Sequence, residues 1–376
     1  MVKPLSLPAH VAYLDSMRGL AALMVIGAHY VNSYDLPCRS DLCNILLTDM
    51  PLHLWWDGGA AVSLFFVLSG LVLSLRYFRH GASADLSIVS LAKYFIGRVC
   101  RIWPPYLVVL SVSALLYQRY QTVASSLPVT IPEQNDWLPY LWGHEAGWRE
   151  FFQDSFLLGM RMEMVYLPQA WTLSIELVLS LFIPLGVFLA ARSTPRLILF
   201  TIFAIVFLHA SPFLVHFMLG ILIAKYQERL GSRLRAKTIY RRCIFVLGLI
   251  LYTQGESFAD KINPVLIGCL TGLGAALLIL EAFGSLRMQQ VLSLSWFRYI
   301  GKISYSIYLV HFAVLISATP MFLSALHASP DWFVCAWWMG FAANIAISIF
   351  IAAFSYRFVE VPSMALGKYL GRKIHP

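Results

Sequence analysis

The sequence has few charged residues. Lys, Arg, Asp and Glu make up 12% of its 376 residues, whereas hydrophobic residues make up 59%. A soluble globular protein carries roughly 25% charged residues, which cover its surface. This chain lacks the polar side chains that such a surface needs, and its apolar residues are gathered into long runs. The shortage of charge therefore excludes an ordinary soluble enzyme and indicates an integral membrane protein.

Cysteine is also scarce, with six residues. Cys38 and Cys43 flank a short polar loop, and they form a structural disulfide only if that loop faces an oxidising compartment. Their spacing resembles no metal site, and we expect no metal cofactor. The other four lie in or beside apolar runs and are predicted to be packing residues: Cys100, Cys243, Cys269 and Cys335.

The formal net charge is +9, yet no basic segment with interleaved aromatic residues accompanies it. We therefore expect no nucleic-acid partner. The excess of Lys and Arg is explained by membrane topology instead, because the cytoplasmic loops of membrane proteins are enriched in these residues.

Apolar runs recur along the whole chain. A bilayer core of ~30 Å requires about 20 apolar residues in a helix. Ten runs are predicted to be transmembrane helices: 12–32, 58–78, 102–120, 169–190, 197–210, 213–226, 243–255, 264–283, 303–325 and 332–356. The fifth to seventh are short, so we expect them to be tilted or extended, or one pair to form a re-entrant hairpin. The predicted fold is an all-α polytopic bundle in a lipid bilayer, with residues 1–376 as a single domain.

Basic residues are distributed unevenly between the two sides of this arrangement. With both termini on one side, that side holds 23 of the 28 Lys and Arg residues. The positive-inside rule makes that side cytoplasmic. We therefore expect a multi-pass protein of the cell inner (plasma) membrane with both termini in the cytoplasm. The longest outer segment, 121–168, is rich in Trp. Either these tryptophans lie at the membrane interface, or the segment forms a cap over a substrate entrance.

The first predicted helix contains three ionisable residues. Such residues inside a membrane are costly in free energy and mark a functional site by default. Asp15, Arg18 and His29 share one helical face, and His29 lies roughly 21 Å from Asp15 along the axis, past the middle of the bilayer. We predict that His29 is a general base, because imidazole titrates near neutral pH. The alternative is a core histidine that is hydrogen-bonded to a backbone carbonyl.

Two further ionisable residues lie in later helices. Glu176 lies about two turns into the predicted fourth helix, and at that depth it needs a basic partner. Three roles are open for Glu176: it orients His29, it binds an acceptor hydroxyl, or it forms a purely structural ion pair. His311 shares a helical face with Ser304 and Tyr308, and this polar stripe either contacts substrate or makes interhelical hydrogen bonds.

Arg98 and Arg101 lie one turn apart at the inner end of the predicted third helix, just before Pro104-Pro105. Two guanidinium groups on one face can bind phosphate oxygens in a bidentate manner. The alternative, which the spacing alone favours, is ordinary anchoring at the cytoplasmic surface.

Six segments together resemble the membrane-bound acyltransferase 3 family of integral membrane O-acyltransferases, which includes O-acetyltransferases. In chain order they are YLDSMRGLAA at 13–22 with His29 downstream, GGAAVSLFFVLSG at 58–70, RVCRIWP at 98–104, WTLSIE at 171–176, GKISYSIYLVH at 301–311 and RFVEVP at 357–362. Thr172 stands where the family usually has Ser, and Gly59 where many members have a polar residue. Neither change removes a predicted proton carrier.

The resemblance implies an enzyme that transfers an acyl group other than an aminoacyl group, usually acetyl, from acyl-CoA to a hydroxyl. In the implied site His29, Glu176, Asp15 and Arg18 are catalytic, Arg98 and Arg101 bind the acyl-CoA, and Trp171, Ser174, Tyr305 and His311 contact the acceptor. His29 either deprotonates the hydroxyl or carries the acyl group itself.

The implied acceptor is a cell-surface carbohydrate, such as a polysaccharide or lipopolysaccharide, or its lipid-linked precursor. Acylation of a small natural product such as a macrolide is the alternative. A proton-coupled secondary transporter or flippase would also use buried Asp, Glu and His. Against a transporter, the two halves of the chain contain no matching pair of interrupted helices. The sequence predicts neither acyl length nor oligomeric state.

Overall fold

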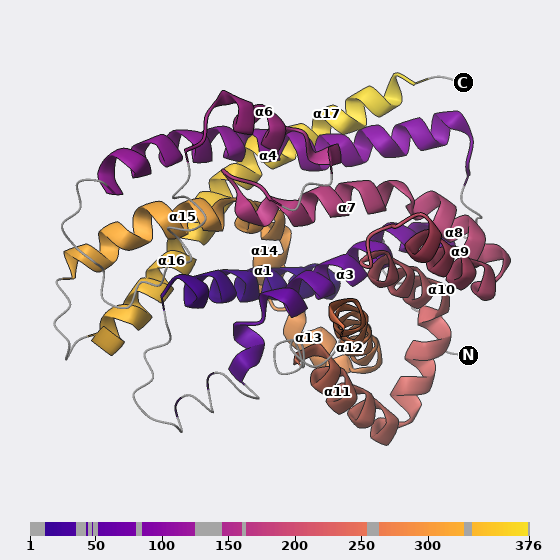
Figure 1. Ribbon diagram of the computed structural model, residues 1–376. Helices are drawn as coiled ribbons and strands as arrows, with labels where there is room; N and C mark the ends of the chain where they lie inside the picture. The colour runs from indigo at the N-terminus through magenta and orange to yellow at the C-terminus, as the bar shows by residue number, and fades with distance from the viewer. Residues whose placement is uncertain are drawn as a thin grey trace.

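A computed structural model describes residues 12–34, 43, 47, 52–79, 85–124, 145–159, 163–253, 263–326 and 333–374. Within these residues the chain folds into helices and contains no strand. The predicted all-α fold is therefore confirmed, and Figure 1 shows the arrangement of the helices in space.

The α-helices are α1 (Ala12–Ser33), α3 (Gly58–Arg79), α4 (Ile88–Ala124), α6 (Trp148–Ser155), α7 (Trp171–Leu181), α8 (Ile183–Arg192), α9 (Thr194–Phe207), α10 (Leu214–Ala236), α11 (Thr238–Thr253), α12 (Pro264–Gly284), α13 (Leu286–Leu292), α14 (Ser295–Lys302), α15 (Ser304–Ala325), α16 (Phe333–Ser355) and α17 (Val361–Arg372). Three short 3₁₀ segments, η1 (Leu52–Trp55), η2 (Leu157–Gly159) and η3 (Pro168–Ala170), lie between them, and a π-helical segment, η4 (Tyr356–Glu360), joins α16 to α17.

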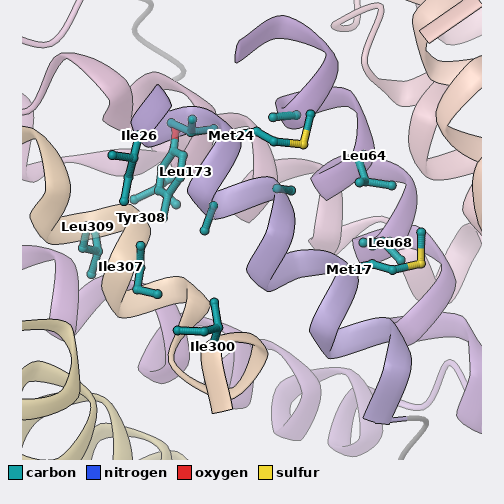
Figure 2. Close-up of a cluster of buried hydrophobic side chains, with 14 of the residues drawn as sticks. Met17, Met24, Ile26, Leu64, Leu68, Leu173, Ile300, Ile307, Tyr308 and Leu309 are labelled. Atoms are coloured by element: carbon teal, nitrogen blue, oxygen red, sulfur yellow. The ribbon is translucent and has the colours of Figure 1, made fainter. Parts of the chain in front are cut away.

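Helix α1 lies at the centre of the bundle. It packs against α3, α14 and α15, and Figure 2 shows its apolar side chains among those of α3, α7, α14 and α15. A Cβ atom on Gly19 of α1 would lie 2.7 Å from the backbone nitrogen of Gly301 of α14. Small residues allow such close approach between membrane helices. The ionisable residues of α1 are thus held by helices on several sides.

Helices α3 and α10 also touch backbone to backbone. A Cβ atom on Gly220 of α10 would lie 2.8 Å from the carbonyl carbon of Gly70, which is in α3. The same atom would lie 2.5 Å from the backbone nitrogen of Leu71. No side chain fits between these two helices at this crossing, so glycine at 220 fixes how closely they pack.

Helix α4 begins at Ile88, earlier than the predicted start at residue 102, and it continues through Pro104 and Pro105. A proline inside a helix leaves the carbonyl four residues earlier without its usual N–H donor. For Pro104 that carbonyl belongs to Cys100, and it accepts a hydrogen bond from the Ser363 hydroxyl of α17. This contact satisfies the carbonyl that Pro104 frees and ties α17 to α4.

The predicted total of ten membrane spans is not confirmed. Among the described residues, five helices have the length and hydropathy of a span, or six if the bent pair α7–α8 counts as one. The other predicted runs do form helices. However, α1 contains Asp15, Arg18 and His29, α9 and α11 are only 14 and 16 residues long, and the second half of α10 is basic. Several apolar helices remain, and they make this a multi-pass membrane protein.

The predicted fourth span, 169–190, is broken. Helices α7 and α8 meet at Phe182 with a bend of 47°, and Pro184 lies in the first turn of α8. Proline is favoured there because the first N–H groups of a helix have no intrahelical partner. The break separates the WTLSIE segment from the apolar remainder of the run.

The cysteines only partly follow their predicted packing role. Cys100 is buried, whereas Cys243 and Cys335 are exposed on the outer surface of the bundle. Cys43 is disulfide-bonded, but the predicted pair includes Cys38, which lies outside the described residues. Of the tryptophans predicted in the outer segment, Trp137 and Trp142 also lie outside them, and Trp148 is 74% exposed.

Replacing Gly220 by Ala should destabilise the bundle. The added methyl group overlaps the backbone of α3, and overpacking of this kind costs about 1–3 kcal/mol. Gly268→Ala is the matched control, because a Cβ atom there meets no other atom within 4 Å. Thermal unfolding in detergent should show a lower Tm for the Gly220 variant alone, and equal Tm values would contradict the close crossing.

Candidate active site

The His29 side chain lies against a second histidine. Its Nδ1 is 2.9 Å from Nε2 of His311 on α15, and the two rings are stacked with centroids 5.1 Å apart. The other nitrogen of His311, Nδ1, lies 2.8 Å from the backbone carbonyl oxygen of Tyr308. The three groups form one hydrogen-bonded chain from α15 to α1.

This chain fixes the tautomers of a neutral pair. A carbonyl oxygen only accepts hydrogen bonds, so Nδ1 of His311 must donate to Tyr308 and Nε2 must accept from His29. His29 then carries its proton on Nδ1, and its Nε2 is unprotonated. An unprotonated imidazole nitrogen is the form that accepts a proton or attacks a carbonyl.

His29 borders a cavity of about 440 Å³, which we call the histidine cavity. Its polar lining comes from α1, the start of α3, η3, α7, α12 and α15. The polar residues are His29, Asn32, Asp57, Ser63, Gln169, Trp171, Thr172, Thr271 and Tyr308. A cavity of a few hundred cubic ångströms with a small number of polar groups is typical of a small-molecule site.

A second, smaller cavity of about 50 Å³ lies on the other side of Tyr308, and we call it the arginine cavity. Its charged and polar lining is Arg18, Arg98, Arg101, Thr172, Glu176, Ser304, Tyr305 and Tyr308. Helix α1 therefore lines both spaces, Arg18 the arginine cavity and His29 the histidine cavity, as expected for residues on one helical face. Asp15 lines neither cavity within the described part of the chain.

The charges of the arginine cavity are closely paired. Arg98 Nη2 lies 3.1 Å from Glu176 Oε1, and Arg98 Nε donates to the Ser180 hydroxyl at 3.0 Å. Ser69 donates to the same Glu176 oxygen at 3.0 Å and accepts from Arg18 at 2.9 Å. Glu176 is therefore the anion that two arginines share, one directly and one through Ser69.

Arg101 is much less constrained than Arg98. Its side chain is 41% exposed, and its nearest carboxylate oxygen, on Glu360, is 3.9 Å away. Glu360 is buried at the end of the π-helical segment η4 and accepts a hydrogen bond from Ser306 at 2.8 Å. Single π-helical turns occur often at functional sites. Here the wider turn coincides with a carboxylate inside the bundle.

The two cavities share three lining residues, Val62, Thr172 and Tyr308. The hydroxyl groups of Thr172 and Tyr308 are 2.5 Å apart, and the Tyr308 hydroxyl also donates to the Gln169 carbonyl at 2.9 Å. The side chains of Val62, Thr172 and Tyr308, which we call the partition, separate the arginines from His29.

The structure brings most of the sequence-predicted site residues together around these cavities. Trp171 lines the histidine cavity, and Tyr305 lines the arginine cavity while donating to the Ile102 carbonyl at 2.6 Å. His311 contacts His29 itself. Ser174 is fully buried and donates to the Leu157 carbonyl, so it faces away from both cavities.

Sequence reasoning missed three polar contacts of the site. Ser69 is the next-to-last residue of the GGAAVSLFFVLSG segment, and its position beside Glu176 has no local sequence signal. Gln169 lies in the wall of the histidine cavity, and its side-chain amide donates a hydrogen bond of 3.2 Å to the Leu309 carbonyl. His216 of α10 is buried and lies 3.2 Å from the hydroxyl of the cavity residue Ser63. A lone histidine in an apolar helix was the available signal for His216.

The site thus combines a histidine pair at one cavity with three arginines and a glutamate at the next. The profile of the acyltransferase 3 family, described as an acyltransferase domain, matches residues 11–357. The match spans nearly the whole chain, and the chain belongs to this family of membrane acyltransferases. Among curated proteins and solved structures, none matches the chain significantly.

Breaking the Arg98–Glu176 ion pair should be strongly destabilising. Glu176→Leu leaves a buried guanidinium without its direct counter-ion, which costs about 3–5 kcal/mol. The double variant Arg98→Met with Glu176→Leu should recover part of the loss, because the guanidinium in direct contact with Glu176 is then absent and only Arg18, which reaches Glu176 through Ser69, still lacks its anion. Thermal unfolding in detergent measures both effects.

The pair Arg241–Glu281, at 3.6 Å and with an arginine side chain that is 24% exposed, provides the control. Arg241→Met should lower the free energy of unfolding by no more than about 1 kcal/mol. Equal effects at the two pairs, or a double variant as unstable as Glu176→Leu alone, would contradict the assigned pairing.

Proposed function

We propose that this acyltransferase moves an acetyl group from acetyl-CoA to a hydroxyl of a cell-surface carbohydrate or its lipid-linked precursor. The observation that supports this most is the pair of cavities that meet at Val62, Thr172 and Tyr308. One contains the cationic groups that suit a phosphorylated donor, and the other contains an unprotonated imidazole nitrogen. A thioester that passes the partition reaches His29.

The donor enters through the arginine cavity. Arg98 is already neutralised by Glu176, so its role is to hold the cavity wall together with Ser180 and Arg18. Arg101 is partly exposed and has no carboxylate closer than 3.9 Å among the described residues, so it is the guanidinium that meets phosphate oxygens. The two arginines of the R-x-x-R element thus have different roles.

His29 Nε2 performs the transfer. In direct transfer it takes the proton of the acceptor hydroxyl while that oxygen attacks the thioester carbonyl. The carbon–sulfur bond then breaks, and the proton passes from His29 to the departing thiolate. In the stepwise route Nε2 attacks the thioester first, the carbon–sulfur bond breaks and CoA leaves as the thiolate. The acceptor oxygen then attacks the acyl group, the carbon–nitrogen bond to His29 breaks, and the proton of the acceptor hydroxyl passes to the thiolate. Both routes begin from the tautomer that His311 imposes through its hydrogen bond.

The acceptor binds in the histidine cavity. Trp56 and Trp171 line it together with Asp57, Asn32 and Gln169. Indole rings offer flat apolar faces, and the carboxylate and amide groups offer hydrogen bonds to hydroxyls. This mixture suits a carbohydrate, which has both C–H faces and many hydroxyls. Asn32 is exposed at the end of α1 and lies at the mouth of the cavity.

The two substrates approach from opposite sides of an inner membrane. The excess of Lys and Arg supports placing the arginine cavity and both termini on the cytoplasmic side. Acetyl-CoA is made in the cytoplasm, and a surface glycan lies outside. In this proposal residues 1–376 form a single domain.

His29→Ala should reduce acetyl transfer by about 10²–10⁴-fold, the usual contribution of a general base. His311→Phe should lose most of the activity as well, because it cannot accept from His29, whereas His311→Gln retains an acceptor and should fall between. Transfer of label from acetyl-CoA to glycan in vesicles measures each rate. His209→Ala, on the exposed surface, is the control, and full activity of His29→Ala would refute the mechanism.

Enlarging Thr172 should block passage between the cavities. Thr172→Leu adds bulk at a 5% exposed position of the partition and removes the hydroxyl that faces Tyr308. Acetyl-CoA binding should persist while transfer falls at least tenfold. Thr172→Ser keeps the hydroxyl and should stay active. Unchanged transfer by the Leu variant would mean that the thioester reaches His29 by another path.

A further inference from the structure

A basic groove lies on the surface between α4 and α17, outside the two cavities. Its volume is about 490 Å³, and its lining residues are Lys93, Gly97, Arg101, Met364, Gly367, Lys368, Gly371 and Arg372. Figure 1 shows α17, in yellow, alongside α4, in purple, and the two helices pack against each other. We call this feature the α4–α17 groove.

The groove follows from the spacing of residues on the two helices. Lys93, Gly97 and Arg101 are four residues apart on α4 and therefore share one face. On α17, Met364, Lys368 and Arg372 repeat the same spacing. A Cβ atom on Gly97 or Gly371 would meet no atom within 4 Å, so these glycines leave open space that a side chain would fill.

Gly367 forms the floor of the groove. A Cβ atom there would lie 2.8 Å from the Cβ atom of Cys100 on α4. The helices therefore touch at the bottom and leave the space between the basic side chains open. This is the form of a binding groove with a closed base.

The charge of the groove is one-sided. Its lining contains four cationic side chains and, among the described residues, no acidic one. Lys93, Lys368 and Arg372 form no ion pair within the described part of the chain, and all three are exposed. Like charges gathered around one open space repel each other, and an anion that binds among them removes this repulsion. Lysine and arginine side chains suit phosphate in particular.

Arg101 connects the groove to the catalytic cavities, because it lines both the groove and the arginine cavity. The three spaces thus follow one another: a wide, exposed and strongly cationic groove, a cavity of about 50 Å³, and the histidine cavity beyond Tyr308. A ligand with a large polyanionic end and a narrow uncharged arm fits this sequence of spaces. Coenzyme A has this form, with a triply phosphorylated nucleotide and a pantetheine arm that ends in the thioester.

We propose that the α4–α17 groove binds the phosphorylated nucleotide of the acyl-CoA donor. Lys93, Lys368 and Arg372 contact its phosphates within the groove, and Arg101 contacts the phosphate from which the pantetheine arm begins. This proposal rests on the proposed function. Lys368 and Arg372 lie beyond the segment that matches the family profile, which ends at residue 357, so the family assignment does not include them. The same groove chemistry would also suit the phosphate of an anionic lipid, and the experiment separates the two.

The test compares two donors with the same thioester. In the double variant Lys368→Glu with Arg372→Glu, the KM for acetyl-CoA should rise at least tenfold. S-acetylpantetheine has the thioester arm without the nucleotide, and its kcat/KM should stay within about twofold of the wild-type value. The control is Arg233→Glu with Arg235→Glu, an equal change of charge on the exposed end of α10, which should alter neither. An unchanged KM for acetyl-CoA in the groove variant would overturn the proposal.

A direct measurement of nucleotide binding tests the groove without relying on acetyl transfer. Adenosine 3′,5′-bisphosphate should bind the purified wild-type protein in lipid-free detergent, and binding should weaken at least tenfold in the groove variant. Gly371→Leu fills the groove without a change of charge and should weaken binding as well, and its thermal unfolding checks that it folds. Nucleotide binding that survives in both variants would overturn the proposal.

Nanodiscs with and without phosphatidylglycerol identify the lipid alternative. If the groove variant loses phosphatidylglycerol binding while its affinity for the nucleotide stays unchanged, the groove is a lipid site and the proposal is wrong. If wild-type protein binds the nucleotide through the groove but transfers acetyl from neither donor, the nucleotide site stands and the proposed function fails.

Discussion

The ion pair between Arg98 and Glu176 determines how the rest of this bundle is organised. A charge inside a membrane protein has no bulk water to solvate it, so it must find a partner on another helix. Glu176 is held by Arg98 from α4, by Ser69 from α3 and, through Ser69, by Arg18 from α1. One carboxylate thus fixes four helices relative to each other. The arginine cavity exists because these polar groups gather there and apolar side chains do not fill the space.

The same network gives the three arginines different contacts. Arg98 and Arg18 are used to balance Glu176, and Arg101 is left partly exposed at the junction of the groove and the cavity. On the far side of Tyr308, hydrogen bonds orient two histidines. A backbone carbonyl sets the tautomer of His311, and His311 sets that of His29. The three arginines therefore line one cavity, and the His29 imidazole lines the other.

The helical fold, the shared face of Arg18 and His29 and most of the candidate residues that lie around the two cavities could be predicted from the sequence, because periodicity and misplaced charge are local signals. The partners could not. Nothing near His29 in the sequence points to His311, which is 282 residues away, and Ser69 resembles any small residue of an apolar helix. The predicted number of spans is not confirmed, because an apolar run does not reveal where a helix bends, as at Phe182, or how far it extends, as in α4 from Ile88. These properties depend on contacts between distant segments, such as the Ser363 hydroxyl that satisfies a carbonyl freed by Pro104.

The π-helical turn at Tyr356–Glu360 affects more than its own five residues. Each residue advances an α-helix by about 100° around its axis, and one residue extra in a single turn offsets everything that follows by that angle. Helix α17 follows directly, so the turn sets the direction in which its positive side chains point. Without the extra residue, Lys368 and Arg372 would be rotated by roughly a quarter turn from α4. The orientation of an entire surface is thus encoded in the length of the chain at one turn, and a one-residue insertion or deletion there would redirect it with every side chain of α17 retained.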